Sequence, residues 1–360
     1  MIGSSIAELD TPRLLVDLDR LDRNITHMAD VFVRHGVGWR PHTKGIKVPA
    51  IAHKLLRAGA FGVTCAKLGE AEVMAAAGIT SILVANQIVG AEKIARLVNL
   101  QRHADVIVAV DDPGNVAMIG AAAAAIGVQQ GLVVEVDTGM NRSGVAPGKP
   151  GLALARLIAA TPGLKLRGVM GWEGHIAGMP PGTQKQAACA AAVGLLTSTA
   201  NVCRAEGLPI EIVSCGGTGT YPISAALPGV TEIQAGGGIF HDLAYASWGL
   251  EHEFALTVLC TVISRPTPTR VVIDAGKKTF SSDQAAPRAM DFPDASPLRL
   301  SAEHGQFDLA AASAHPAVGD RIRCIVGYND TTVHLHEFMI GVRGDRVEIV
   351  WPVLGRGRLQ

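Results

Sequence analysis

Short β-prone runs alternate with longer helical segments from residue 38 to residue 237. In the longer segments apolar residues recur every three or four positions, and several of these segments stop at glycine, which is typical of amphipathic helices. The strand-like runs are GWRPHT, FGVTCA, SILVAN, DVIVAV, LVVEVD, LRGVMGW, IEIVSCGG and TEIQAGG. This alternation predicts repeated βα units.

Eight βα units in about 200 residues favour a (β/α)8 TIM-type barrel over an open doubly wound sheet, because a barrel needs that strand number to close. The open sheet stays the alternative. After residue 250 the pattern changes to strands separated by Gly, Pro and Asp turns, without helices, which predicts a C-terminal all-β domain. We expect a barrel at residues 20–248 and a β domain at 1–19 plus 249–360. The opening TPRLLVDLDRLDRNI contains a further strand and a helix start, which we expect to pack on the β domain.

Composition narrows the choice of partners and location. The formal net charge is zero and only 4% of residues are aromatic, so neither a basic surface nor stacking side chains favour nucleic acid binding. The six cysteines form no CxxC pair, which indicates free thiols in a reducing compartment rather than disulfides or a zinc site. The N-terminus lacks a signal-peptide pattern and the longest apolar run is too short to cross a bilayer. We therefore expect a cytoplasmic protein without a membrane partner.

Two glycine-rich stretches follow the seventh and eighth predicted strands. They read SCGGTGTY, residues 214–221, and QAGGGIF, residues 234–240. In a TIM-type barrel, phosphate is often bound after these two strands, and glycine turns offer backbone N–H groups unobstructed by Cβ atoms. A tight turn would explain either stretch alone. Their joint placement predicts a phosphate site, to which the hydroxyl of Ser214 also contributes.

Polar residues stand at the ends of three other predicted strands. Lys44 ends the first strand and is either a surface lysine or a nucleophile able to form an imine with a carbonyl. Asp137 and Arg142 follow the fifth strand, where a structural salt bridge explains them equally well. His175 follows the sixth strand and is either a structural histidine or a base.

Taken together, these motifs resemble a known family. RPHTK, EVDTGMNRSGV, GWEGH, SCGGTGTY, IDAGKKTFSSD, EHG at residues 303–305 and the closing WPVLGRG occur in the order of the pyridoxal-phosphate enzymes of alanine-racemase-like fold. Within that fold they resemble the D-threonine aldolase and D-serine dehydratase branch. The resemblance covers nearly the whole chain. It implies a barrel that binds pyridoxal 5'-phosphate (PLP), a β domain, and a homodimer with the active site near the interface.

The resemblance also implies roles for single residues. Lys44 would be the Schiff-base lysine, positioned and electrostatically tuned by Arg40 and His42, because the amine must be neutral to attack an aldehyde. Arg142 would hold the phenolic oxygen of PLP, and His175 would be the general base. The residues implied for the phosphate are Gly217, Thr218, Gly219, Gly236 and Gly237.

The sequence departs from the family at its metal site. Members of the branch commonly bind a divalent metal ion through a His-x-Cys or His-x-Asp pair followed by Thr-Val-Asn. Here GYNDTTVHLHE places Tyr328 at the position of the first histidine and Asp330 at that of the second ligand. On an extended strand Asp330, His334 and His336 share one face, so a rebuilt metal site is one possibility and a metal-free site is the other.

The leading hypothesis is a PLP-dependent carbon–carbon lyase that cleaves D-β-hydroxy-α-amino acids such as D-threonine to glycine and an aldehyde. β-Elimination from D-serine or 3-hydroxyaspartate is the alternative. It is less favoured because Asp330 stands in the place of the soft Cys ligand of the zinc dehydratases. A non-catalytic PLP-binding protein is the third reading, against which the expected β domain argues. A racemase is weaker still.

Overall fold

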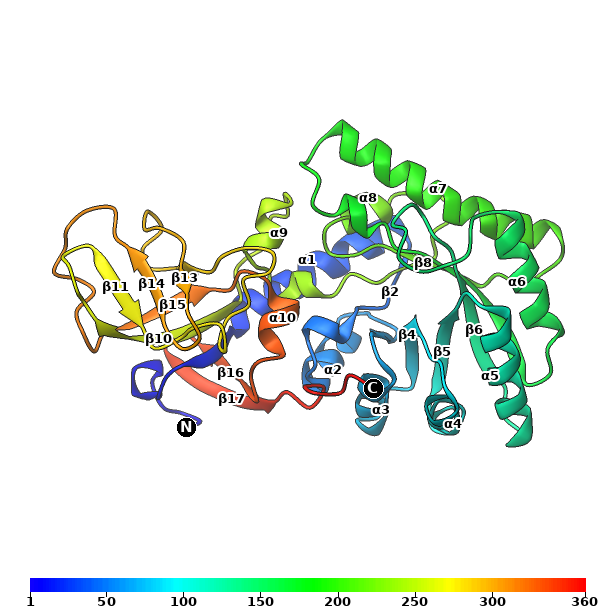
Figure 1. Ribbon diagram of the computed structural model, residues 1–360, viewed down its shortest axis with the longest axis horizontal. Coiled ribbons are helices and arrows are strands. Elements are labelled where there is room, and N and C mark those ends of the chain that lie inside the picture. The colour runs from blue at the N-terminus through cyan, green and yellow to red at the C-terminus, as the bar shows by residue number, and fades with distance from the viewer. The chain divides into compact units, whose positions relative to one another are not determined.

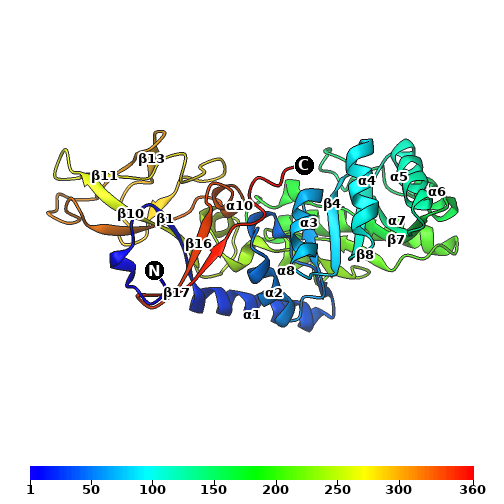
Figure 2. The same ribbon diagram turned by 90° about the horizontal axis from the view of Figure 1, so that it is seen from below.

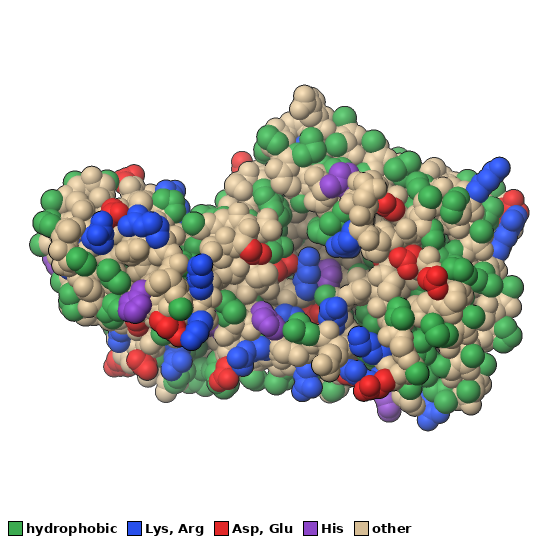
Figure 3. All heavy atoms as spheres, viewed as in Figure 1, with side chains coloured by type: hydrophobic (Ala, Val, Ile, Leu, Met, Phe, Trp, Pro, Cys, Tyr) green, Lys and Arg blue, Asp and Glu red, His purple; other side chains and the backbone are tan.

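The computed structural model describes residues 1–360, which form two compact units (Figure 1). The first, here called the β unit, comprises residues 1–27, 45–48 and 237–356. The second, here called the barrel unit, comprises residues 28–44, 49–236 and 357–360. On the face drawn in Figure 3, Lys and Arg side chains are interspersed with Asp and Glu side chains.

The barrel unit contains eight parallel strands in the order β2-β9-β8-β7-β6-β5-β4-β3. A parallel bridge between His42 and Thr64 joins the two ends of this order, so the sheet closes. Every strand falls within or beside a run predicted from the sequence, and the TIM-type barrel is therefore confirmed. The strands are β2 (Gly38–Trp39), β3 (Val63–Cys65), β4 (Ser81–Gln87), β5 (Asp105–Val110), β6 (Gln130–Glu135), β7 (Leu164–Met170), β8 (Ile212–Cys215) and β9 (Glu232–Ile233).

Helices cover the outside of this sheet, as Figures 1 and 2 show for α4 to α7. They are α2 (Pro49–Arg57), α3 (Leu68–Ala76), α4 (Ala91–Leu100), α5 (Pro113–Ala125), α6 (Lys149–Ala160), α7 (Thr183–Ala205) and α8 (Tyr221–Ser224). By length and composition α7 could cross a membrane, but it packs on β7 and β8 as a barrel helix. Buried side chains from β4 to β8 form one cluster: Leu83, Ile107, Ala109, Val133, Met170 and Ile212.

The β unit is built on a nine-stranded, mostly antiparallel sheet with the main order β13-β14-β11-β10-β1-β16-β17. In it β1 pairs with β10 and β16, which confirms that the opening strand packs on the C-terminal part of the chain. Helix α1 (Leu18–His35) follows β1. The strands are β1 (Arg13–Asp17), β10 (Leu256–Ser264), β11 (Arg270–Ile273), β12 (Arg288–Ala289), β13 (Arg299–Leu300), β14 (Gly305–Asp308), β15 (Arg321–Ile325), β16 (Phe338–Arg343) and β17 (Arg346–Pro352).

The β unit also contains two short helices, α9 (Leu243–Ser247) and α10 (Asn329–Val333). Of these, α10 lies after residue 250, where strands without helices were expected, so that expectation was wrong at α10. The error matters at α10, where an extended strand was predicted from Tyr328 onward. Asp242 accepts the backbone N–H of Asn329 at 2.8 Å, and the Asn329 side chain donates to the Gly237 carbonyl at 2.7 Å. These contacts with residues far away in sequence hold a helical turn despite β-branched residues.

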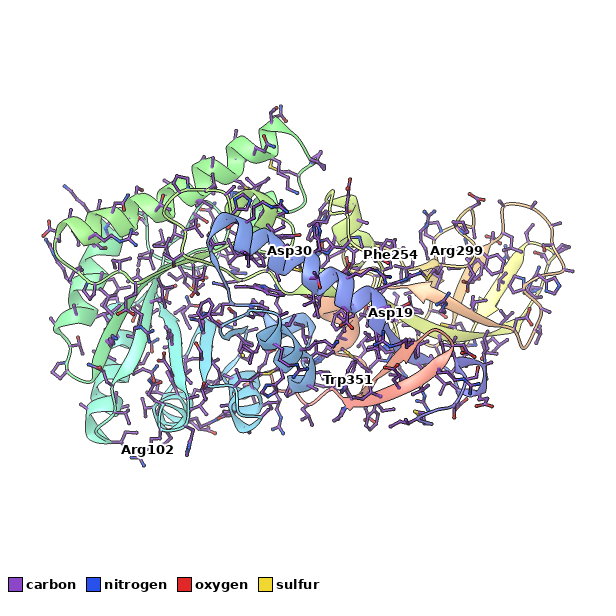
Figure 4. All side chains as sticks on the ribbon, turned by 180° about the vertical axis from the view of Figure 1, so that it is seen from behind. Asp19, Asp30, Arg102, Phe254, Arg299 and Trp351 are labelled. Atoms are coloured by element: carbon purple, nitrogen blue, oxygen red, sulfur yellow. The ribbon has the colours of Figure 1, made fainter.

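A histidine pair lies in the β unit, with His241 buried and His252 half-buried. The rings of His241 and His252 stack at 5.7 Å, and Phe254, labelled in Figure 4, stacks on His241 at 4.8 Å. Burial lowers the pKa of His241 to about 4 and that of His252 to about 3. Burial acts in the opposite sense on Asp242, whose pKa it raises to about 8. Both imidazoles are therefore neutral in the folded protein at neutral pH.

Candidate active site

Lys44 lies on a 3-10 turn (Thr43–Gly45) that begins four residues after β2 ends. Its backbone N–H donates to Nδ1 of His42 at 3.3 Å, so His42 fixes the turn through the main chain. The half-buried Lys44 side chain places Nζ 5.1 Å from the centre of the Trp172 ring. A cation over an indole face is attracted by the ring quadrupole. The turn therefore directs the Lys44 amine toward the residues that follow β7.

Trp172 is the residue around which the candidate site gathers. The guanidinium carbon of Arg142 also lies 5.1 Å from the indole centre. A Cβ atom on Gly217 would come within 2.7 Å of Trp172 Nε1, so only glycine fits there. Lys44, Arg142 and the first glycine turn thus meet around one ring. Trp172 lies within the motif GWEGH, but nothing in the sequence pattern assigned it a role.

Arg142 is positioned by Glu135 at the end of β6. The Arg142 guanidinium lies 3.9 Å from a Glu135 oxygen, and the Ser143 hydroxyl donates to Glu135 at 2.8 Å. The Gln87 side chain donates to the same carboxylate from β4. Glu135 is buried, whereas Arg142 remains 51% exposed and is accessible to a ligand. A pocket at this point is lined by Glu135, Val136, Asp137, Thr138, Met140, Arg142, Ser143 and Trp172.

The salt bridge considered between Asp137 and Arg142 is not the arrangement that the structure shows. Asp137 instead accepts the backbone N–H groups of Gly139 and Asn141, at 2.9 and 3.1 Å. It therefore shapes the loop that carries Arg142.

His175 lies on a 3-10 turn (Gly174–Ile176) after β7 and is exposed. A Cβ atom on Gly139 would lie 3.3 Å from its Nε2 atom. His175 therefore packs against the same loop as Arg142, with an accessible ring nitrogen. An exposed imidazole beside the pocket is available for proton transfer.

Glu173 organises the glycine turn after β8. Its side chain is 1% exposed and accepts three hydrogen bonds: from the Gly216 N–H at 3.3 Å, the Thr220 hydroxyl at 2.7 Å and the Ser224 hydroxyl at 2.5 Å. Burial, and then the negative charge of Glu173, raise the pKa of the Cys189 thiol to about 11. Sequence reasoning missed Glu173, although it lies in the quoted GWEGH. The only signal was an acidic residue three positions after the end of β7.

Two glycine turns leave buried backbone donors without partners. The N–H groups of Gly219 and Gly236 make no hydrogen bond within the protein, although both residues are buried. The turns follow β8 and β9, which pair directly, so they lie next to each other. A Cβ atom on Gly236 would overlap the backbone of His42. Because orphaned buried N–H groups are rare, their presence in adjacent turns indicates an anion site.

The hydroxyl groups predicted at this site differ in their surroundings. Ser214 is fully buried on β8, and its hydroxyl accepts the Gln234 side chain at 2.9 Å. Thr218 is buried within the first turn itself. Gly237 follows Gly236 in the chain and belongs to the β unit, where a Cβ atom would come within 2.5 Å of the Tyr245 hydroxyl.

Arg40 is engaged in a buried ion pair of the barrel wall. Its Nε atom pairs with Glu232 at 3.0 Å, and both side chains are 3% exposed. Its Nη1 atom donates to Ser81 at 2.9 Å, and its guanidinium lies 4.4 Å from the Phe61 ring centre. These partners give Arg40 a structural role, and an effect of its charge on Lys44 stays a prediction.

The surroundings of Asp330 in the β unit do not fit a divalent metal ion. Asp330 accepts the Tyr328 hydroxyl at 3.0 Å, and no group of three or more His, Cys, Asp or Glu side chains is arranged to hold a metal ion. His336 is turned away, with Nε2 2.9 Å from the Thr279 carbonyl. Because metal ions are held by several such ligands, Asp330 alone is insufficient.

His334 has positively charged neighbours. Burial lowers its pKa, and the positive charges of Lys47 and Arg356 lower it further. Positive neighbours oppose the binding of a cation. The metal site rebuilt from Asp330 with His334 or His336 rested on an extended strand. The helical turn of α10 removes the face that Asp330 would share with His336, whereas His334, four residues after Asp330, stays on the same side of the turn.

Comparison with known proteins identifies the class. Residues 16–243 match the family described as alanine racemase, N-terminal domain, and residues 255–342 match a putative serine dehydratase domain. The chain therefore belongs to the alanine-racemase-like family, as the motifs predicted.

Particular relatives are similar over nearly the full length. A D-threonine aldolase of Arthrobacter is 34% identical over 99% of this chain and 95% of its own. A 3-hydroxy-D-aspartate aldolase of Paracoccus denitrificans is 35% identical over 99% and 94%. The crystal structure of D-threonine aldolase from Filomicrobium marinum matches with a TM-score of 0.97 and 35% identity, covering 100% of this chain and 99% of that one.

The family implies PLP as cofactor, and the residues of the barrel unit fit it. Lys44 offers an amine, and the Arg142 guanidinium lies over the same Trp172 indole ring as that amine. The adjacent glycine turns offer buried donors that lack partners, as a phosphate group requires.

Proposed function

We propose that this protein is a PLP-dependent lyase that cleaves D-β-hydroxy-α-amino acids of the D-threonine type to glycine and an aldehyde. The observation that carries the proposal is the meeting of Lys44, Arg142 and the glycine turn at Gly217 around Trp172. Similarity to aldolases over nearly the whole chain supports the reaction type.

Each group has a role in this proposal. Lys44 would hold the cofactor covalently, and Gly219 and Gly236 would donate their N–H groups to its phosphate. Arg142 would donate to its phenolic oxygen. PLP, when bound, supplies an electron sink for the bond that breaks.

The chain's own residues handle the substrate. His175, exposed beside the Arg142 loop, removes the proton of the substrate β-hydroxyl, so that the Cα–Cβ bond breaks and the aldehyde leaves. The Cα atom then takes up a proton, and glycine is released.

β-Elimination is the second candidate function. The observation in its favour is a D-threo-3-hydroxyaspartate dehydratase of Delftia that is 34% identical over 79% of this chain and 76% of its own. In that reaction the β-substituent leaves as water, and a keto acid and ammonia result.

Product analysis separates the two. The purified protein with PLP is incubated with D-threonine, D-serine and D-threo-3-hydroxyaspartate, with the Lys44→Ala variant as control. Glycine with an aldehyde from the first or third substrate supports the aldolase, whereas keto acid with ammonia supports the dehydratase. Absence of both products from every substrate would refute the proposal.

We also propose a cytoplasmic homodimer. All six cysteines are free and buried, which suits a reducing compartment. In a single chain, His175 is exposed and Arg142 is half-exposed, so a second subunit has room to cover the site. Light scattering after gel filtration tests the dimer, and a monomeric mass would refute it.

A further inference from the structure

The β unit contains a hydroxyl–carboxylate pair that the proposed function does not use. The Tyr328 hydroxyl donates to Asp330 at 3.0 Å. The Tyr328 ring lies edge-on to Tyr245 at 5.7 Å and 6.3 Å from Trp248. These two aromatic side chains, from α9 and its C-terminal end, pack around the phenol and fix its orientation.

Two glycines contact the segment of the Tyr328–Asp330 pair, and each of them follows a candidate-site residue in the chain: Gly45 follows Lys44, and Gly237 follows Gly236. The Asp330 carboxylate lies against Gly45, the residue after Lys44, where a Cβ atom would overlap it. Asn329, between Tyr328 and Asp330, donates to the carbonyl of Gly237. Gly45 and Gly237 both belong to the β unit, so these contacts lie within one compact unit. The packing leaves no room for a side chain at Gly45.

The family resemblance places a metal-binding histidine at position 328, and the residues here disagree with it. A neutral phenol donates a hydrogen bond to Asp330, whereas a neutral histidine nitrogen would offer a lone pair to a metal ion. The Tyr328 hydroxyl thus donates to the Asp330 carboxylate without adding a ligand for a cation. Of the two nearby histidines in sequence, His336 lies with Nε2 2.9 Å from the Thr279 carbonyl, and His334 has the positively charged neighbours Lys47 and Arg356.

We infer that this protein works without a divalent metal ion bound at Asp330. At position 328 a phenol donates a hydrogen bond to this carboxylate, and it does not supply the second metal ligand that the family resemblance places there. The inference does not depend on which reaction the protein catalyses, because it follows from the residues around Asp330.

The test compares three proteins: the wild type, Tyr328→His, and Tyr328→Phe as a matched variant that keeps the ring and loses the hydroxyl. Metal content is measured by elemental analysis, and Mn²⁺ binding by calorimetry on the PLP-loaded proteins. We expect no stoichiometric metal and no saturable Mn²⁺ binding in the wild type and in Tyr328→Phe. Tyr328→His should bind Mn²⁺ at least about 10-fold more tightly, because an imidazole beside Asp330 adds a second ligand.

Activity gives the second readout. The turnover of the wild type and of Tyr328→Phe should in each case be unchanged after dialysis against a chelator. Stoichiometric metal in the wild type, or activity that chelation abolishes and Mn²⁺ restores, would overturn the inference. Tyr328→His without tighter Mn²⁺ binding would overturn the assignment of position 328. If no substrate is cleaved at all, the proposed function fails, while the metal measurements still decide this inference.

Discussion

The buried ion pair of the barrel unit allows a prediction with a defined magnitude. Arg40 and Glu232 are each 3% exposed, and their charged atoms are 3.0 Å apart. Replacing Arg40 by Met removes the only ion-pair partner of Glu232 and leaves a carboxylate inside the barrel wall. Breaking a buried pair in this way costs about 3–5 kcal/mol, because the remaining charge keeps its desolvation penalty. We therefore expect Arg40→Met to unfold at a clearly lower urea concentration.

The matched control is the double variant Arg40→Met/Glu232→Leu. Replacing both charges with apolar side chains removes the desolvation penalty, so most of the lost stability should return. Urea unfolding followed by far-UV circular dichroism gives the free energies of unfolding of all three proteins. A loss below about 1 kcal/mol in Arg40→Met, or no recovery in the double variant, would refute the reasoning.

The same variant separates two roles of Arg40. If Arg40 stabilises the wall and does not tune Lys44, the absorption maximum of bound PLP in Arg40→Met should match that of the wild type. A shifted maximum would show that its charge acts on the Lys44 amine.

Three further predictions concern the cofactor and acid stability. Lys44→Ala should abolish the PLP adduct that borohydride traps, whereas Lys47→Ala should retain it; mass spectrometry locates the adduct. Glu173→Gln should weaken PLP binding roughly 10-fold in a fluorescence titration, because the amide cannot accept all three hydrogen bonds; unchanged affinity would contradict this. With pKa values of about 4 and 3, His241 and His252 stay neutral in the folded protein while the unfolded chain takes up protons below about pH 6.5. Asp242, whose pKa is raised to about 8, is protonated in the folded protein in this range and ionised in the unfolded chain, so it offsets the proton uptake of one histidine. As the pH falls from about 6.5 to about 4, the free energy of unfolding should therefore fall by about 1.4 kcal/mol per pH unit. A flat profile in denaturant titrations across this range would contradict it.

The sequence by itself determined the order of strands and helices in the barrel. Alternating β-prone and helical runs depend on neighbours within a few residues, so the eight strands could be found without the fold. The position of Lys44 after the first strand and of both glycine turns after the last two followed from the same pattern, because the carboxyl ends of parallel strands meet on one side of the barrel.

The tertiary structure decided which side chains contact one another. Arg40 pairs with a residue 192 positions away, which became its neighbour only when β2 and β9 paired in register. Trp172 became central because Lys44, Arg142 and Gly217 reach it from three separate loops. The helical turn at Asn329 formed against its β-branched composition, since Asp242 and the Gly237 carbonyl accept hydrogen bonds from its backbone and side-chain N–H groups. Local periodicity carries no information on such contacts, because they depend on the closure of the sheet and on side chains that are distant in sequence.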